Sequence, residues 1–380
     1  MKKAILSFFV LLLVVTSVSA QEKRTPKAKY IFLFIGDGMG FTEVNATEAY
    51  LAAKEGKIGI KKLDFTQFPN IALATTYAAD RYITDSAAAG TALSTGQKTA
   101  VETVGMDVSK KKKLKNMAEM ARDAGMKVGI ISTVNMNDAT PSTFYAHQPH
   151  RKMYKEITQD LLNSEYDLFA GGGLKKVDVK DALLSKGYKI TSTKREFSKI
   201  NKGCGKLYAM CPNLDKDMAC RFSIDQDSSD IKLKDFVSRA IDVLDNPNGF
   251  FIMTESGKID WANHANDAPS AIKDILALND AVKEAIKFYK KHPDQTLIVV
   301  TSDHETGGFA QGSYKTGYDT NFKLLDDRTK PEKTGVSWCT DSHTGTPVGV
   351  FAIGNGTDKL RGYIDNTDVA KAIISILVAK

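Results

Sequence analysis

The sequence predicts an α/β fold with a central, mainly parallel sheet, helices on both of its faces, and irregular insertions. Two observations support this prediction. Short apolar runs alternate along the chain with segments of helical periodicity, as in repeated βα units. The apolar runs are continuous rather than alternating with polar residues, which is typical of strands that are buried on both faces.

The predicted elements follow one another in a regular order. The first apolar run ends at a glycine-rich turn between Gly36 and Gly40, and three alanines after Ser86 favour a helix. Strands are predicted at 29–35, 71–77, 127–133, 166–170, 249–254, 296–301 and 347–353. Helices are predicted from Asp85 onward and at 114–124, 153–162, 234–244, 269–289 and 366–378.

Length and composition are those of a globular protein. Of the 380 residues, 42% are hydrophobic and 26% are charged, which excludes a disordered or membrane-embedded chain. Residues 21–380 are predicted to form a single α/β domain. Two stretches rich in Gly, Lys, Asp, Ser and Thr, near 171–230 and 307–340, are interpreted as insertions within it.

The N-terminus has the pattern of a secretory signal peptide. Lys2 and Lys3 precede an apolar run at 4–15, and small residues lead up to Ala20. The run is too short to span a bilayer comfortably, and no stop-transfer charges follow it. We expect residues 1–20 to be removed after Ala20 and the mature protein to be secreted or periplasmic, without a membrane anchor.

The charge balance is mildly basic. The formal net charge of +7 falls to +5 without Lys2 and Lys3. The dense basic run at 110–113 has no interleaved aromatic residues, so a specific nucleic-acid partner is not expected. Anionic small molecules remain compatible with this charge.

Four cysteines in an exported protein can form two disulfides. Cys204, Cys211 and Cys220 are close in sequence, whereas Cys339 is remote. We expect at least one disulfide within the cluster, since no C-x-x-C pair or neighbouring histidine indicates zinc. The pairing stays open.

Ser86 is a candidate nucleophile. It lies between Asp85 and the alanine run, at the start of a predicted helix whose free N–H groups and positive dipole end attract anions. A phosphate group could bind there. Taken alone, the segment is described more simply as an ordinary N-cap formed by Thr84 or Asp85.

Acidic and imidazole side chains recur just past the predicted strands, where a parallel sheet would bring them to one edge. Asp260 and His264 are four residues apart, which on a helical turn places two potential zinc ligands on one face. The set comprises Asp37, Asp138, Glu255, Asp260, His264, Asp303, His304 and His343.

Other polar residues give weaker signals. Asp138 and Thr140 offer hard oxygen ligands of the kind that Mg²⁺ accepts, and Arg151 offers a planar fork that matches phosphate. Of the remaining histidines, His292 is interpreted as structural. The roles of His147 and His150 are left open.

Taken together, these residues resemble the alkaline phosphatase family. The matching motifs occur in the same order along nearly the whole mature chain, and the resemblance weakens in the two irregular stretches. The motifs are Gly-Asp37-Gly-Met-Gly, Thr-Asp-Ser86-Ala-Ala, Asp138-Ala-Thr140-Pro, Arg151, Glu255 with Asp260 and His264, Asp303-His304, and His343-Thr-Gly. The resemblance implies a homodimeric, metal-dependent phosphomonoesterase that forms a phosphoserine intermediate.

The resemblance also implies two Zn²⁺ and one Mg²⁺ per subunit. The first zinc site would comprise Asp260, His264 and His343, the second Asp37, Asp303 and His304, and the magnesium site Asp37, Thr140 and Glu255. Ser86 would be the nucleophile, Arg151 would bind phosphate oxygens, and Asp138 would hold a water on magnesium. Two zinc ions roughly 4 Å apart can stabilise both the attacking and the leaving oxygen of an in-line displacement.

Trp261 departs from the family pattern. It follows Asp260 at a position where well-known relatives often have Lys or His, cations that approach the phosphate through water. A tryptophan cannot do this. We therefore expect weaker binding of the product phosphate and an altered metal preference at the third site.

Two other functions stay open. A phosphodiesterase or nucleotide pyrophosphatase of the same superfamily would keep both zinc ions, but it usually has a threonine nucleophile and lacks the magnesium ligands. A non-catalytic phosphate- or metal-binding protein would not need a nucleophile beside two metal sites. Ser86, Thr140, Glu255 and Arg151 favour a monoesterase over the diesterase.

Overall fold

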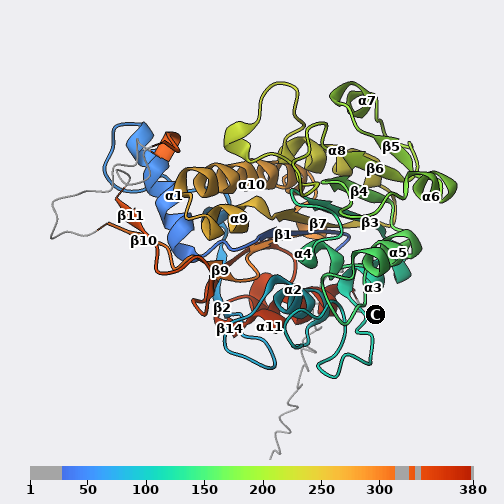
Figure 1. Ribbon diagram of the computed structural model, residues 1–380, viewed down its shortest axis with the longest axis horizontal. Helices are drawn as coiled ribbons and strands as arrows, with labels where there is room; N and C mark the ends of the chain where they lie inside the picture. Colours follow the sequence, from blue (N-terminus) through green and yellow to red (C-terminus); the bar gives the residue numbers. More distant parts are fainter. Residues whose placement is uncertain (1–27, 313–324, 330–334, 378–380) are drawn as a thin grey trace, which may run out of the picture.

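The computed structural model describes residues 28–312, 325–329 and 335–377. Its centre is a ten-stranded sheet in the order β14-β2-β13-β8-β1-β7-β3-β4-β6-β5 (Figure 1). Neighbouring strands pair in parallel except at β13, which runs antiparallel to β8 and to β2. The prediction of a mainly parallel sheet is therefore confirmed.

The sheet strands are β1 (Tyr30–Gly36), β2 (Asn70–Thr75), β3 (Lys127–Ser132), β4 (Leu168–Gly171), β5 (Lys189–Thr191), β6 (Leu207–Met210), β7 (Phe250–Ser256), β8 (Thr296–Thr301), β13 (Val348–Gly354) and β14 (Gly362–Asp365). Within the described ranges, two small antiparallel pairs lie outside this sheet. They are formed by β9 (Glu305–Thr306) with β12 (His343–Thr344), and by β10 (Ala310–Gln311) with β11 (Val336–Ser337).

The helices are α1 (Phe41–Lys54), α2 (Ser86–Thr95), α3 (Met117–Asp123), α4 (Ala139–Ser142), α5 (Tyr154–Ser164), α6 (Lys180–Ser185), α7 (Lys194–Ser198), α8 (Leu233–Leu244), α9 (Lys258–His264), α10 (Ala268–Tyr289) and α11 (Asn366–Leu377). They cover both faces of the sheet, with α8 and α10 above it and α2, α3, α5 and α11 below it in Figure 1.

Strand β1 shows why the buried strands are apolar throughout. Successive side chains of a strand point to opposite faces. Phe32 and Phe34 pack in the core beneath α8 and α10, whereas Ile31 and Leu33 pack in the core that α3, α5 and α11 cover. Helices cover both faces of the sheet at this strand, so every residue of β1 is buried.

The stretch 171–230 contains regular elements that the sequence analysis did not predict. Strands β5 and β6 extend the sheet in parallel. Along the chain, α6 lies between β4 and β5, and α7 lies between β5 and β6. The strands have three and four residues, which is too short for a periodic hydrophobic signal. These two strands of the stretch are thus part of the central sheet.

A disulfide joins Cys211 to Cys220 just past β6. The expectation of a bridge within the cysteine cluster is confirmed. Cys204 and Cys339 are free thiols.

The expected signal peptide at 1–20 lies outside the described residues. Of the second irregular stretch, residues 313–324 and 330–334 also lie outside them. Across the described ranges, no helix has the length and apolar character needed to cross a membrane.

Candidate active site

Three neighbouring strands at the centre of the sheet carry the first group of candidate ligands. Asp37 follows β1, Glu255 lies near the end of β7, and Asp303 follows β8. Because β8, β1 and β7 are adjacent and parallel, their carboxyl ends meet at one edge. All three carboxylates are buried. The sheet therefore brings together the acids that the sequence predicted at strand ends.

Gly38 allows this edge to pack closely. Its φ of 69° is in the left-handed region, and a Cβ there would lie 2.8 Å from the Cα of Asp260. Only glycine satisfies both constraints without strain. The turn after β1 can therefore lie directly against α9.

Ser86 is the first residue of α2. Asp85 is the N-cap and accepts a hydrogen bond from the N–H of Ala88, so the capping interpretation of this segment is correct. The Oγ of Ser86 is buried and lies 3.1 Å from Nε2 of His304. Capping by Asp85 leaves the Ser86 hydroxyl free to face the candidate ligands.

Asp260 and His264 share one face of α9, as their spacing predicts. Nε2 of His264 lies 3.3 Å from Oδ2 of Asp260 and 3.2 Å from Nε2 of His343. Both imidazoles donate from Nδ1 to carbonyl oxygens, His264 to Asp341 at 2.6 Å and His343 to Thr84 at 2.9 Å. Because a carbonyl only accepts, these bonds leave Nε2 of each ring as the atom directed at Asp260.

The candidate ligand atoms form two overlapping groups. Those of Asp37, Asp303 and His304 lie within 4.8 Å of one another, and so do those of Asp260, His304 and His343. His304 thus borders both groups. His264 belongs to neither group, although the resemblance assigns it to a zinc site with Asp260 and His343. It contacts both of these residues and so lies beside the group that contains them.

Thr140 and Glu255 lie next to Asp37. The Oγ1 of Thr140, on α4, is 3.2 Å from Oδ2 of Asp37 and 3.4 Å from Oδ2 of Asp303. Glu255 accepts a hydrogen bond from the hydroxyl of Ser132 at the end of β3. Among the described residues, Oε1 of Glu255 and Oδ1 of Asp37 are buried and have no hydrogen-bond partner.

Burial and mutual repulsion shift the pKa values of these acids. Burial raises the pKa of Asp37 well above its usual range, and the charges of Asp303 and Asp260 raise it further. Burial and the charge of Asp260 raise the pKa of Asp303 to about 7. Burial raises the pKa of Glu255 to about 8, although its bond from Ser132 opposes the shift. Buried carboxylates with unpaired oxygens fit bound cations, which would compensate their charge.

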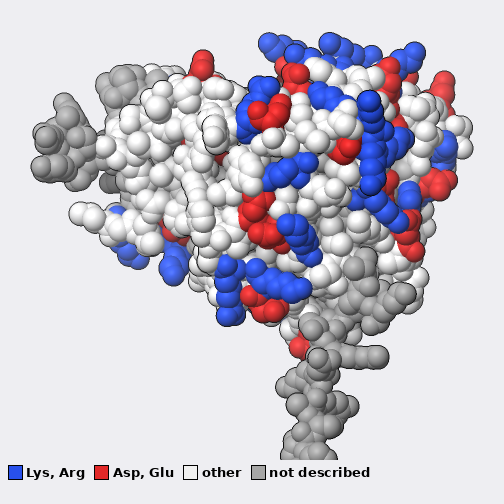
Figure 2. All heavy atoms as spheres, turned by 90° about the horizontal axis from the view of Figure 1, so that it is seen from below, with Lys and Arg blue, Asp and Glu red and all other residues white. Residues whose placement is uncertain are grey.

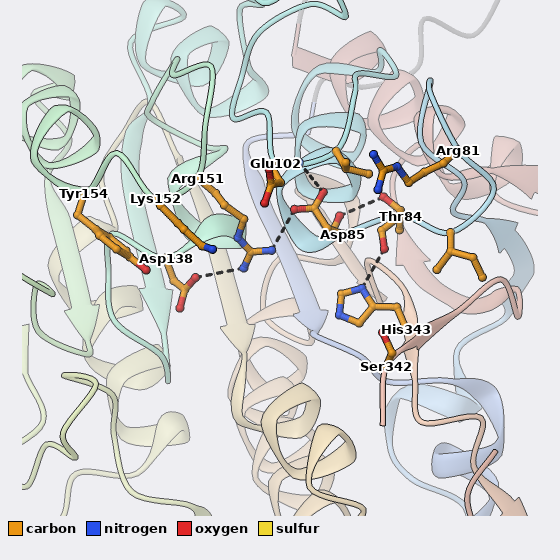
Figure 3. Close-up of a pocket in the computed structure, with 12 residues that line it drawn as sticks. Arg81, Thr84, Asp85, Glu102, Asp138, Arg151, Lys152, Tyr154, Ser342 and His343 are labelled. Atoms are coloured by element: carbon orange, nitrogen blue, oxygen red, sulfur yellow. Dashed lines mark hydrogen bonds and ion pairs between the residues drawn. The ribbon is translucent and has the colours of Figure 1, made fainter. Parts of the chain in front are cut away.

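Arg151 lies in the wall of a cleft of about 770 Å³ that is also lined by Thr84 and Asp85, the two residues before Ser86 (Figure 3). One of its terminal nitrogens is 3.0 Å from a carboxylate oxygen of Asp85, and the other is 3.4 Å from one of Asp138. These two ion pairs orient the guanidinium group along the cleft. The lining residues are Arg81, Ile83, Thr84, Asp85, Val101, Glu102, Asp138, Arg151, Lys152, Tyr154, Ser342 and His343.

Several residues around the site make contacts that the sequence does not reveal. Ser132 donates to Glu255, and Thr306 donates to Oδ1 of Asp260 at 2.6 Å. Trp261 lies beside Asp260 on α9, and the ammonium group of Lys258 lies 4.2 Å from the centre of its ring. The remote partners of these residues could not be read from the sequence.

The other histidines lie outside the two ligand groups. His292 contacts the rings of Tyr30 and Phe288, as a structural residue should. His150 forms an ion-pair contact with Glu102, with 2.9 Å between Nε2 and Oε2. His147 is a hydrogen-bonded structural residue.

The fold and the site define a class of protein: an α/β enzyme in which carboxylates and imidazoles suited to metal ions surround a buried serine. The chain belongs to the alkaline phosphatase family, because the family model described as Alkaline phosphatase matches residues 28–331. Alkaline phosphatases are phosphomonoester hydrolases that depend on metal ions, so the protein is a hydrolase of this type.

Relatives match over most of their length. Alkaline phosphatase 4 of Bacillus subtilis (strain 168) is 30% identical, over 94% of this chain and 91% of the relative. Alkaline phosphatase of Escherichia coli (strain K12) is 28% identical, over 90% of this chain and 84% of the relative.

Solved structures agree with this assignment. The cold-active alkaline phosphatase of a psychrophilic Shewanella sp. superimposes with a TM-score of 0.81 at 28% identity, covering 92% of this chain and 99% of that one. Alkaline phosphatase from the Antarctic bacterium TAB5 superimposes with a TM-score of 0.78 at 30% identity, covering 93% of this chain and 98% of that one.

Proposed function

We propose that this enzyme is an exported phosphomonoesterase that transfers the phosphoryl group of a phosphate monoester first to Ser86 and then to water. One observation carries the proposal. The Oγ of Ser86 is buried at the N-terminus of α2, 3.1 Å from His304, which belongs to both groups of candidate ligands. An anion is favoured at this helix end by the free N–H groups and the helix dipole.

The proposed ligands are those that the family resemblance implies. Asp260, His264 and His343 would hold one Zn²⁺, Asp37, Asp303 and His304 a second, and Asp37, Thr140 and Glu255 a Mg²⁺. A structure of a mutant TAB5 enzyme is described with magnesium bound in a metal site, which supports magnesium as one of the ions. When bound, such ions act as Lewis acids for the attacking and leaving oxygens of an in-line displacement.

The residues of the chain have separate tasks in this reaction. The Ser86 oxygen loses its proton to solvent and attacks phosphorus, the bond to the alcohol oxygen breaks, the departing oxygen takes up a proton, and a phosphoserine forms. A water molecule then loses a proton to solvent and attacks phosphorus from the vacated side, the bond between phosphorus and the Ser86 oxygen breaks, that oxygen regains a proton, and inorganic phosphate leaves. Arg151, oriented by Asp85 and Asp138, donates to the phosphoryl oxygens together with the N–H groups at the start of α2.

An apolar patch supports the proposal of a homodimer. Four large apolar side chains are exposed near the β14 edge of the sheet: Phe41 (43%), Ile71 (46%), Leu73 (39%) and Tyr363 (68%). Tyr363 is directly opposite Leu73 in the β14–β2 pair, so both side chains point to the same face. A second copy of the chain would remove this surface from water.

The charge distribution supports small substrates rather than a nucleic acid. In the view from below, basic and acidic side chains are interspersed over one half of the face, and few charges occur on the other half (Figure 2). On this face, acidic side chains interrupt the basic ones, whereas a phosphate backbone would require a continuous basic track. Export is proposed from the pattern of residues 1–20, and a mature N-terminus at Gln21 in secreted protein would support it.

Hydrolysis of p-nitrophenyl phosphate at alkaline pH tests the proposed function. We expect activity in the mature protein, and loss of activity both after treatment with a chelator and in Ser86→Ala. A chelator-sensitive wild type combined with an active Ser86→Ala variant would refute the phosphoserine mechanism. Faster hydrolysis of bis-p-nitrophenyl phosphate than of the monoester would instead identify a diesterase.

A further inference from the structure

A buried lysine begins the helix that carries two of the candidate ligands. Lys258 is the first residue of α9, two positions before Asp260, and is only 1% exposed. A lysine is rarely buried to this extent unless its charge is paired. The proposed reaction gives this side chain no task.

The partners of Lys258 explain how its charge is tolerated. Its Nζ lies 2.8 Å from Oδ2 of Asp215, and it lies 4.1 Å and 4.2 Å from the ring centres of Phe222 and Trp261, respectively. An opposite charge and two aromatic faces replace the lost hydration of an ammonium group. Asp215 and Phe222 belong to other segments, so their contacts with Lys258 fix the first turn of α9 from outside the helix.

Asp215 belongs to the loop that the Cys211–Cys220 disulfide closes. Its Oδ1 accepts hydrogen bonds from the N–H groups of Asp217 and Ala219, at 2.8 and 3.0 Å, while its Oδ2 faces Lys258. The carboxylate thus organises the loop and binds α9 at the same time.

The same loop also contacts the end of β3. The N–H of Cys220 donates to the carbonyl of Thr133 at 2.9 Å, and the N–H of Lys258 donates to Oγ1 of Thr133 at 3.3 Å. Thr133 follows Ser132, which donates to Glu255. The loop, α9 and the end of β3 therefore form one hydrogen-bonded unit behind the candidate ligands.

We propose that Lys258 is a positioning residue that holds α9 against the disulfide loop, so that Asp260 and His264 keep the separation that the first zinc ion requires. The inference rests on the proposed zinc sites. Removal of a residue that hydrogen-bonds to a metal ligand typically lowers metal affinity by roughly 10- to 100-fold. Because Lys258 acts on the ligands only through the helix backbone, we expect a loss at the lower end of this range, roughly tenfold.

Zinc binding by the metal-stripped mature protein tests this inference without an activity assay. In competition with a chromophoric chelator, Lys258→Met should bind one of the two zinc ions roughly tenfold more weakly than the wild type and the other with unchanged affinity. Lys258→Arg, which keeps the charge, should restore most of the affinity.

Lys175→Met is the matched control. Lys175 pairs with Asp217 of the same loop, with 2.6 Å between Nζ and Oδ1, and this ion pair does not involve α9. The variant removes the same charge from the same region and should bind both zinc ions as the wild type does.

Equal zinc affinities of Lys258→Met and the wild type would overturn the inference, and so would an equal loss in Lys175→Met. If circular dichroism shows that Lys258→Met is unfolded, Asp215→Asn tests the same contact, because it removes the charge and keeps the Oδ1 acceptor; an unchanged zinc affinity there also overturns the inference. A wild type that binds no zinc would refute the proposed function instead.

Discussion

At the scale of the residue, His147 shows how burial and hydrogen bonding decide the role of a histidine. Its Nδ1 lies 2.8 Å from the carbonyl oxygen of Gly105, and its Nε2 lies 3.0 Å from Oε1 of Glu119. Burial lowers the pKa of His147, but the bonds to Glu119 and Gly105 outweigh burial, so that the pKa is raised. The same pair lowers the pKa of Glu119 against the opposing effect of burial.

A raised pKa makes the contribution of His147 depend on pH. The stabilisation is fully present below the unfolded pKa of about 6.5 and is lost as pH rises through the higher folded value. His147→Gln should therefore reduce the free energy of unfolding by roughly 0.5–1.5 kcal/mol near pH 6 and by less near about pH 9. Urea unfolding at both pH values measures this difference. A loss of unfolding free energy in His147→Gln that grows with pH would contradict the raised pKa of His147. The control is His150→Gln, because His150 pairs with Glu102 at the exposed surface.

The departure at Trp261 gives a second residue-scale prediction. Trp261→Lys would supply a cation beside Asp260, and we expect phosphate to inhibit this variant at roughly 2- to 10-fold lower concentration than the wild type. Trp261→Phe keeps an aromatic ring, so phosphate should inhibit this variant at the same concentration as the wild type. Inhibition constants for inorganic phosphate and turnover numbers check the prediction, and identical values for Trp261→Lys and wild type would refute it.

The candidate site divides into residues that the sequence reveals and residues that it does not. Asp37, Glu255 and Asp303 could be predicted because strand ends in a parallel sheet meet at one edge. Lys258 could not, because its role depends on Asp215, whose place behind α9 is set by the disulfide loop. Spacing along the chain carries local geometry but says nothing of a partner brought in from a distant segment.

At the scale of the element, the disulfide loop should stabilise the fold. Replacing both Cys211 and Cys220 by alanine should lower the free energy of unfolding by roughly 2–3 kcal/mol, because the unfolded chain gains the entropy of an open loop. Cys204→Ala, at a free thiol in the same region, should change it by less than about 1 kcal/mol. Denaturant unfolding of the metal-stripped protein distinguishes the two. Equal stability of the double variant and the wild type would show that the loop is held by its hydrogen bonds alone.

The elements also show where hydrophobic patterns stop being informative. The long strands β1, β7 and β8 were predicted because a continuous apolar run of their length is distinctive. β13 was predicted as a strand, but an apolar run does not reveal that it is antiparallel to its neighbours. In β2, alternate residues are exposed although the sequence is apolar, because one face of the strand has no cover within the described structure.

At the scale of the whole molecule, that uncovered face predicts the oligomeric state. Leu73→Lys places a charge in the apolar patch and should convert a dimer into a monomer, since the charge would have to be desolvated in the interface. Leu184→Lys is the matched control, because Leu184 is 49% exposed on α6, near β5 at the opposite end of the sheet from β14. Light scattering after size-exclusion chromatography measures both. A dimeric Leu73→Lys protein would exclude this patch as the interface.

The order of the candidate ligands along the chain has a consequence for timing. Ser86, Arg151 and Asp37 are made early, whereas Asp303, His304 and His343 come from the last quarter of the sequence. A chain that is still being synthesised therefore contains the proposed nucleophile without a complete set of ligands for either proposed zinc site. If the proposed sites are correct, we expect the chain to hydrolyse phosphate esters only after its last quarter has folded onto its beginning.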